Sequence, residues 1–125
     1  MVIREFNFKP ANAIQTDRAV RVAIVKADSF VSRSILLGKI IDDAEIDLAM
    51  AYTQEGKLSL RRTHRSSQNV LQIDCSEIAA TFREGGGHPG AAGGFLKTNL
   101  NKNRDSAALV EIESNLQNYF EKLGQ

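Results

Sequence analysis

The stretch IDLAMAYTQEGKLSLRRT, residues 46–63, contains two runs of alternating side chains joined by the turn signal QEG. In both runs an apolar residue recurs at every second position, which is the period of a β-strand with one buried face. The glycine of QEG suits the tight turn between two antiparallel strands. Residues 46–53 and 57–63 are therefore predicted to form a β-hairpin.

On the N-terminal side of this hairpin, residues 19–27 read AVRVAIVKA, a run dense in β-branched side chains. Such a run predicts an interior strand. Apolar positions at helical spacing then predict a helix over residues 29–41, with Asp28 and Ser29 as candidates for its N-cap. Strand, helix and hairpin in this order indicate that helices pack on a sheet.

On the C-terminal side, Asp74 is expected to cap a short helix, with Glu77 completing a capping-box-like pair. The helix should end at EGGGHPGAAGGF, residues 84–95, which is expected to hold neither a regular strand nor a long helix. Pro89 is expected to begin a short helical turn. The following GFLKT, residues 94–98, is predicted to return to the sheet.

The end of the chain carries an amphipathic stripe from Leu109 to Leu123, preceded by Asp105 and Ser106. This stripe predicts a last helix that covers the sheet. The element order predicts an α/β fold, a small mixed β-sheet flanked by helices. Residues 19–125 are interpreted as one domain and residues 1–18 as an N-terminal segment or interdomain linker.

Composition limits the classes of function. The 125 residues are 42% hydrophobic and carry a formal net charge of +1, so any affinity for nucleic acid must come from a local patch. The single cysteine, Cys75, and the lack of a long apolar run predict a cytoplasmic protein with no membrane partner. Only His64 and His88 are available as imidazole ligands, and no metal-binding motif accompanies them, so no metal site is expected.

Three consecutive glycines, Gly85, Gly86 and Gly87, precede His88. Such a loop can bring backbone N–H groups close to an anion, and a helical turn at Pro89 would add the positive end of a dipole. We interpret the segment as a phosphate-binding or carboxylate-binding loop. The alternative is a flexible surface loop in which the histidine is incidental.

A second candidate group lies on the strand predicted for residues 57–63. The period of two places Ser59 and Arg61 on the face opposite Leu58 and Leu60. A guanidinium can bind two phosphate oxygens at once, although a single exposed arginine can also serve only solubility. The continuation RRTHRS adds Arg62, His64 and Arg65, which are interpreted either as backbone contacts for a nucleic acid or as a solvated loop.

Three further side chains have competing interpretations. Phe6 and Phe8 are expected to pack on the core or on a neighbouring domain rather than stack on bases. Cys75 stands near a helix start, where a thiol can be activated, but without a catalytic partner it is expected to be a buried small hydrophobe.

The segment GGGHPGAAGGF, together with the upstream KLSLRR, resembles the C-terminal DHH-associated domain of DHH phosphoesterases. That family includes RecJ-like exonucleases, oligoribonucleases and cyclic-dinucleotide phosphodiesterases, and a related domain occurs in alanyl-tRNA synthetase. The resemblance implies that Gly85, Gly86, Gly87 and His88 contact the substrate, and that Arg61 and Ser59 belong to a serine-x-arginine-serine strand motif. Arg62 replaces the second serine of that motif.

The resemblance also implies which parts this chain lacks. In the family, a separate DHH domain binds two manganese ions, so the chain is expected to hold no cofactor, to bind without hydrolysing alone, and to work with a DHH domain in cis or trans. Its expected ligand is a nucleotide or a short single-stranded nucleic acid. Two alternatives remain open, namely an interaction module that forms a homodimer without ligand, and a tRNA-binding accessory.

Overall fold

The computed structural model describes residues 2–6, 20–27, 33–42, 45–63, 73–97 and 105–123. Within these ranges six strands form one mixed sheet in the order β1-β2-β3-β4-β6-β5, together with three helices. The strands are β1 (Val2–Phe6), β2 (Val20–Lys26), β3 (Leu48–Tyr52), β4 (Lys57–Arg62), β5 (Arg83–Gly87) and β6 (Ala91–Phe95). The helices are α1 (Arg33–Ile41), α3 (Cys75–Ala79) and α4 (Asp105–Leu123). The predicted α/β fold is confirmed.

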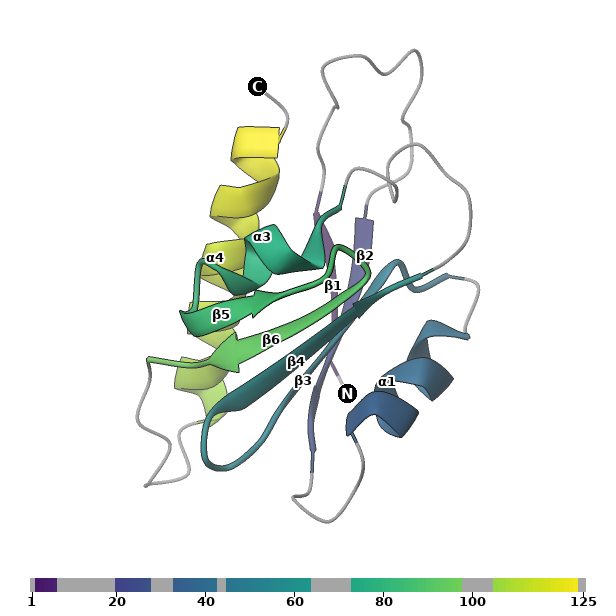
Figure 1. Ribbon diagram of the computed structural model, residues 1–125, viewed down its shortest axis with the longest axis horizontal. Helices are drawn as coiled ribbons and strands as arrows, with labels where there is room; N and C mark the ends of the chain where they lie inside the picture. The colour runs from purple at the N-terminus through teal and green to yellow at the C-terminus, as the bar shows by residue number, and fades with distance from the viewer. Residues whose placement is uncertain are drawn as a thin grey trace.

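The sheet has a different helical layer on each face (Figure 1). On one face, α3 and α4 cover the large apolar side chains of the central strands, including Ile24, Met50 and Leu60. On the other face, α1 packs on alanines, with Leu37 and Ile41 of the helix against Ala23, Ala49 and Ala51. Since successive strand residues point to opposite faces, this alternation assigns the residues of the regularly paired strands β2, β3 and β4 to one face or the other.

The predicted interior strand is β2, which pairs antiparallel with β1 and parallel with β3. β1 thus pairs within the same sheet, although residues 1–18 are predicted to be an N-terminal segment or interdomain linker. The Phe6 ring packs on that of Phe120, with 5.3 Å between centroids, so its predicted packing on the core is confirmed. Phe8 lies outside the described residues.

The predicted hairpin is confirmed, since β3 and β4 pair antiparallel from Leu48 opposite Arg62 to Tyr52 opposite Leu58. Gly56 takes a φ of 86° in the turn, a value that L side chains rarely adopt. A backbone hydrogen bond of 3.0 Å from the Thr53 N–H to the Lys57 carbonyl closes that turn.

The glycine-rich segment forms two strands, and the expectation that residues 84–95 hold no regular strand is wrong. β5 and β6 pair antiparallel, and β6 also pairs with β4. Glycine costs entropy in a strand, but here it permits close approach, since a Cβ at Gly94 would lie 3.0 Å from the Cα of Gly85. Because β6 ends at Phe95, only the first two residues of the predicted GFLKT strand lie in it.

The predicted helical turn at Pro89 is also wrong. Pro89 and Gly90 connect β5 to β6, and the flanking His88 and Ala91 exchange two backbone hydrogen bonds of 2.9 and 3.2 Å. This is the bonding of a two-residue β-hairpin connection.

The helices agree with the sequence pattern in most respects. The Asp74 carboxylate accepts hydrogen bonds from the amides of Ser76 and Glu77 at the start of α3, which confirms the cap. The Asp74 N–H donates to the hydroxyl of Tyr119 at 2.9 Å. In a capping box the Glu77 carboxylate would accept this N–H, so Tyr119 takes the role predicted for Glu77. α1 is described from Arg33, so its predicted start at residue 29 and the caps Asp28 and Ser29 lie outside the described residues.

The amphipathic stripe of α4 is buried along the helix, with Ala108, Ile112, Leu116, Tyr119 and Phe120 in the core. This confirms that the last helix covers the sheet. Among the helices described, none combines the length and the apolar character that a membrane span requires.

Candidate anion-binding site

Backbone pairing brings His88 and Arg61 into one row across three neighbouring segments. Ala91 stands opposite Arg61 in the register of β4 and β6. The same alanine exchanges backbone hydrogen bonds with His88 on its other side. Directly opposed residues of antiparallel strands present their side chains on the same face. Arg61 and Ala91 therefore share one face of the sheet, and His88 stands beside Ala91 on the side away from Arg61, with roughly 10 Å between the Cα atoms of His88 and Arg61.

A second row runs beside the first, in which Ser59 stands opposite Gly93 and Gly93 opposite Gly86. We call the two rows together the open patch, which comprises Ser59, Arg61, Gly86, His88, Ala91 and Gly93. Its middle consists of an alanine and glycines, while a serine, an arginine and a histidine stand around it. A ligand on the open patch can thus approach the backbone closely and still meet polar side chains.

The open patch lies on the face of the sheet that carries α1. Arg61 pairs with Ala49 and Ser59 with Ala51, and both alanines belong to the core beneath α1. The helix packs against β3 and β4. Farther along the sheet, Gly86, His88 and Ala91 are exposed. The patch therefore extends from the rim of α1 outward over β6 and β5.

The three consecutive glycines have different structural requirements. A Cβ at Gly85 would lie 1.6 Å from the carbonyl oxygen of Ala79, so α3 excludes any side chain there. Gly87 has a φ of 145° and a Cβ would lie 2.6 Å from the Cα of Ala92. At Gly86 a Cβ would meet no described atom within 4 Å, and its φ is not positive. Packing and backbone conformation explain the glycines at positions 85 and 87, but they do not explain Gly86.

The tip of this hairpin is tied to the rest of the domain. The Cys75 N–H at the start of α3 donates to the Pro89 carbonyl at 2.8 Å, and the Arg62 N–H donates to the Gly90 carbonyl at 2.9 Å. His88 is therefore displayed from an anchored connection. The expected helix dipole beside the imidazole is absent from this connection, and the His88 N–H is already bonded to Ala91.

Arg62, the next basic residue along the chain, does not join the open patch. Arg62 stands opposite Leu48 and so belongs to the face of α3 and α4, where its guanidinium donates to the Ile73 carbonyl at 2.7 Å. This contact holds the chain segment that leads into α3. His64 and Arg65 lie outside the described residues.

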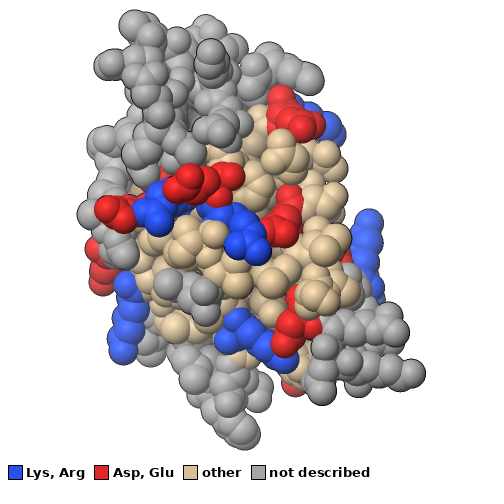
Figure 2. Space-filling view, turned by 180° about the vertical axis from the view of Figure 1, so that it is seen from behind, with Lys and Arg blue, Asp and Glu red and all other residues tan. Residues whose placement is uncertain are grey.

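Several basic side chains of the described surface are paired with acidic ones. Figure 2 shows such a face, where blue and red side chains adjoin rather than form a field of one sign. The pairs are Arg4 with Glu113, Arg21 with Glu5 and Glu45, and Lys26 with Asp105. Such pairing reduces the positive potential that would attract a polyanion to these places.

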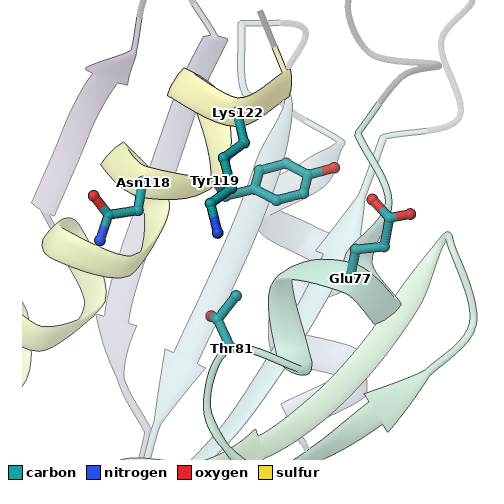
Figure 3. Close-up of a pocket in the computed structure, with 5 residues that line it drawn as sticks. All are labelled: Glu77, Thr81, Asn118, Tyr119 and Lys122. Carbon is teal, nitrogen blue, oxygen red and sulfur yellow. The ribbon is translucent and has the colours of Figure 1, made fainter. Parts of the chain in front are cut away.

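A pocket of about 330 Å³ lies between α3 and α4, on the face opposite the open patch (Figure 3). Its lining residues are Glu77, Thr81, Asn118, Tyr119 and Lys122. The Glu77 carboxylate offsets the positive charge of Lys122 in this pocket, and the Tyr119 oxygen already accepts the Asp74 N–H. The open patch is therefore the candidate anion site that we consider further.

Two buried groups nearby are structural. Burial raises the pKa of the Cys75 thiol to about 12, and Cys75 is fully buried against the core. This confirms its interpretation as a small hydrophobe. Burial likewise raises the pKa of Tyr119 to about 12. Neither group is available as a nucleophile near neutral pH.

The manganese of the DHH resemblance does not fit the described part of this chain. Within those residues no group of three or more His, Cys, Asp or Glu side chains could hold a metal ion. The open patch offers an anion a guanidinium, an imidazole and accessible backbone.

Comparison of the sequence with protein-family models and with curated proteins finds no match. Among solved structures, an exopolyphosphatase-related protein from Bacteroides fragilis superposes with a TM-score of 0.60 and 18% identity, over 83% of this chain and 31% of that one. An uncharacterized protein from Helicobacter pylori G27 gives a TM-score of 0.52 and 18% identity, over 94% and 28%. The C-Ala domain of Aquifex aeolicus alanyl-tRNA synthetase gives a TM-score of 0.54 and 12% identity, over 91% and 98%.

At these identities the comparisons show a shared fold. The chain spans less than a third of the Bacteroides and Helicobacter proteins, and it corresponds to nearly the whole C-Ala domain. The same α/β unit thus occurs as a part of longer proteins and as a separately crystallised domain.

Proposed function

We propose that this chain is a recognition domain for the phosphate of a nucleotide or of the end of a short single-stranded nucleic acid. The observation that carries the proposal is the row in which His88 and Arg61 flank Ala91 on the open patch. A guanidinium binds phosphate oxygens through two parallel N–H groups, and an imidazole N–H supplies a further donor. Side chains of these lengths, on Cα atoms roughly 10 Å apart, can reach one phosphate between them.

The small residues between the two donors support the same ligand. Neither packing nor the backbone φ requires glycine at position 86, and the space that a Cβ would fill there is open. A sugar or base attached to the phosphate would use this space, since a ligand can lie against glycine without meeting a Cβ.

The proposal extends to the wider protein. The resemblance of GGGHPGAAGGF and KLSLRR to DHH-associated domains supports a role in presenting substrate to a DHH-type catalytic domain, in cis or in trans. Hydrolysis of the phosphodiester, with its manganese ions, would belong to that domain. The shared fold with part of an exopolyphosphatase-related protein agrees with a phosphoesterase relation.

The test is a titration of the chain with a fluorescently labelled thymidine tetranucleotide that carries a terminal phosphate, at about 50 and about 200 mM salt. We expect binding that weakens with salt, and a loss of at least roughly tenfold in the Arg61→Ala/His88→Ala variant, because charged hydrogen bonds are removed. Arg4→Ala is the control, because it removes the same unit of charge from a residue outside the open patch, where it pairs with Glu113. Its affinity should stay within about twofold of the unmodified chain.

Two outcomes contradict the proposal. One is binding that does not respond to salt, and the other is equal binding by the unmodified chain and the double variant. Concentration-dependent self-association without any binding would favour the interaction module instead.

A tRNA-binding accessory is the second candidate, because the C-Ala domain matches over 98% of its own length. Competition between the labelled tetranucleotide and an unlabelled folded tRNA distinguishes the two. Displacement by tRNA at far lower concentration than by unlabelled tetranucleotide would favour the accessory role.

A further inference from the structure

A glycine stands within α1, a helix of nine residues, where glycine is less favourable than any residue except proline. Gly38 has regular helical bonding, since its carbonyl accepts the Asp42 N–H at 3.1 Å. Its φ is not positive. Backbone conformation therefore does not require glycine at this position.

The space beside Gly38 is occupied by the side chain of Arg61. A Cβ at Gly38 would lie 3.1 Å from Nη1 of Arg61, and no other described atom outside the helix lies within 4 Å. The arginine stem begins next to Ala49, which belongs to the small-residue core under α1. The Arg61 guanidinium therefore lies against α1 at Gly38.

This contact limits where the guanidinium can go. α1 covers β3 and β4, whereas the open patch continues over β6 and β5. A side chain at position 38 would occupy the place where the Arg61 nitrogen now lies. From this we infer that Gly38 is a positioning residue, which keeps room for the Arg61 guanidinium at the rim of the phosphate site. The inference rests on the proposed function of Arg61.

The test is the substitution Gly38→Ala, measured alone and together with Arg61→Ala. Alanine is the better helix former, and the neighbour that must give way is the end of a flexible side chain. The urea midpoint should therefore equal or exceed that of the unmodified chain. Binding of the phosphorylated thymidine tetranucleotide should weaken about three- to tenfold, the range of coupling between residues in contact.

In the Arg61→Ala background, Gly38→Ala should leave the remaining affinity unchanged, because the group on which Gly38 acts is gone. A residue that served only packing would not show this dependence. Gly38→Ser serves as a second variant, and it should weaken binding at least as much as alanine.

The outcomes separate this inference from the proposed function. If Arg61→Ala binds like the unmodified chain, the proposed phosphate site is wrong. If Arg61→Ala weakens binding, the positioning role is overturned by any of three results. These are unchanged binding in Gly38→Ala, an equal effect of Gly38→Ala in both backgrounds, and a lowered urea midpoint.

Discussion

Replacing Gly86 with valine is expected to weaken ligand binding without a large change in the free energy of unfolding. A Cβ at this position meets no described atom within 4 Å, and the backbone φ is one that an L residue can adopt. β-branched residues suit an edge strand, so the free energy of unfolding should change by no more than about 0.5 kcal/mol. The valine side chain would stand on the open patch, where the ligand is proposed to approach the backbone.

The expected effect on binding is a loss of about tenfold or more, which corresponds to roughly 1.4 kcal/mol. The neighbouring Gly85→Ala is the contrasting variant. Its Cβ would lie 1.6 Å from the Ala79 carbonyl oxygen, so α3 or β5 must move, at a cost of about 3 kcal/mol or more. Urea unfolding followed by circular dichroism gives the stabilities, and fluorescence anisotropy of the labelled tetranucleotide gives the affinities.

Gly86→Val is therefore expected to keep its stability and lose its ligand, whereas Gly85→Ala is expected to be strongly destabilised. Binding of the tetranucleotide by Gly86→Val as tight as that by the unmodified chain would refute the role of Gly86. Strong destabilisation by Gly86→Val would also refute it, since the side chain would then meet protein where the structure leaves space.

Two further predictions concern the start of α3. The Ser76 hydroxyl, followed by the Ser76 and Glu77 amides, stabilises the Asp74 carboxylate and lowers its pKa below the unfolded value, so its stabilising effect should be lost as pH falls below about 4. Asp74→Asn should flatten the pH dependence of unfolding in that range, and an unaltered dependence in urea titrations would contradict the assignment. The Cys75 thiol, with a pKa raised to about 12 by burial, should react with a thiol reagent at pH 8 only in urea, whereas rapid native labelling would show that it is accessible.

Periodicity of side chains explains which elements could be predicted from the sequence. The hairpin of β3 and β4 alternates large apolar and small or polar residues, and α4 repeats apolar residues at helical spacing. β5 and β6 consist largely of glycine and alanine, which show no such alternation and also favour loops. Their pairing with β4 depends on long-range contacts that local propensity does not report.

The candidate site was predictable in part. GGGH and Arg61 are identified from residue chemistry, and the register places His88 in the row of Arg61 and Gly86 in the row of Ser59. The prediction of a helical turn at Pro89, with its dipole, is wrong because Pro89 and Gly90 form a tight hairpin turn. Arg62 could not be distinguished from Arg61 by charge, although the strand period places the two on opposite faces. Gly38 was visible only as a glycine inside a predicted helix, and its contact with Arg61 required the structure.

An NMR titration with the phosphorylated tetranucleotide tests most directly where the ligand binds. Amide signals are followed in the 15N-labelled chain as ligand is added. The largest shifts are expected at Gly86, His88, Ala91 and Gly93, with the Arg61 side chain signal moving in parallel. Shifts centred on Asn118 and Lys122, with the open patch unchanged, would contradict the proposed binding site.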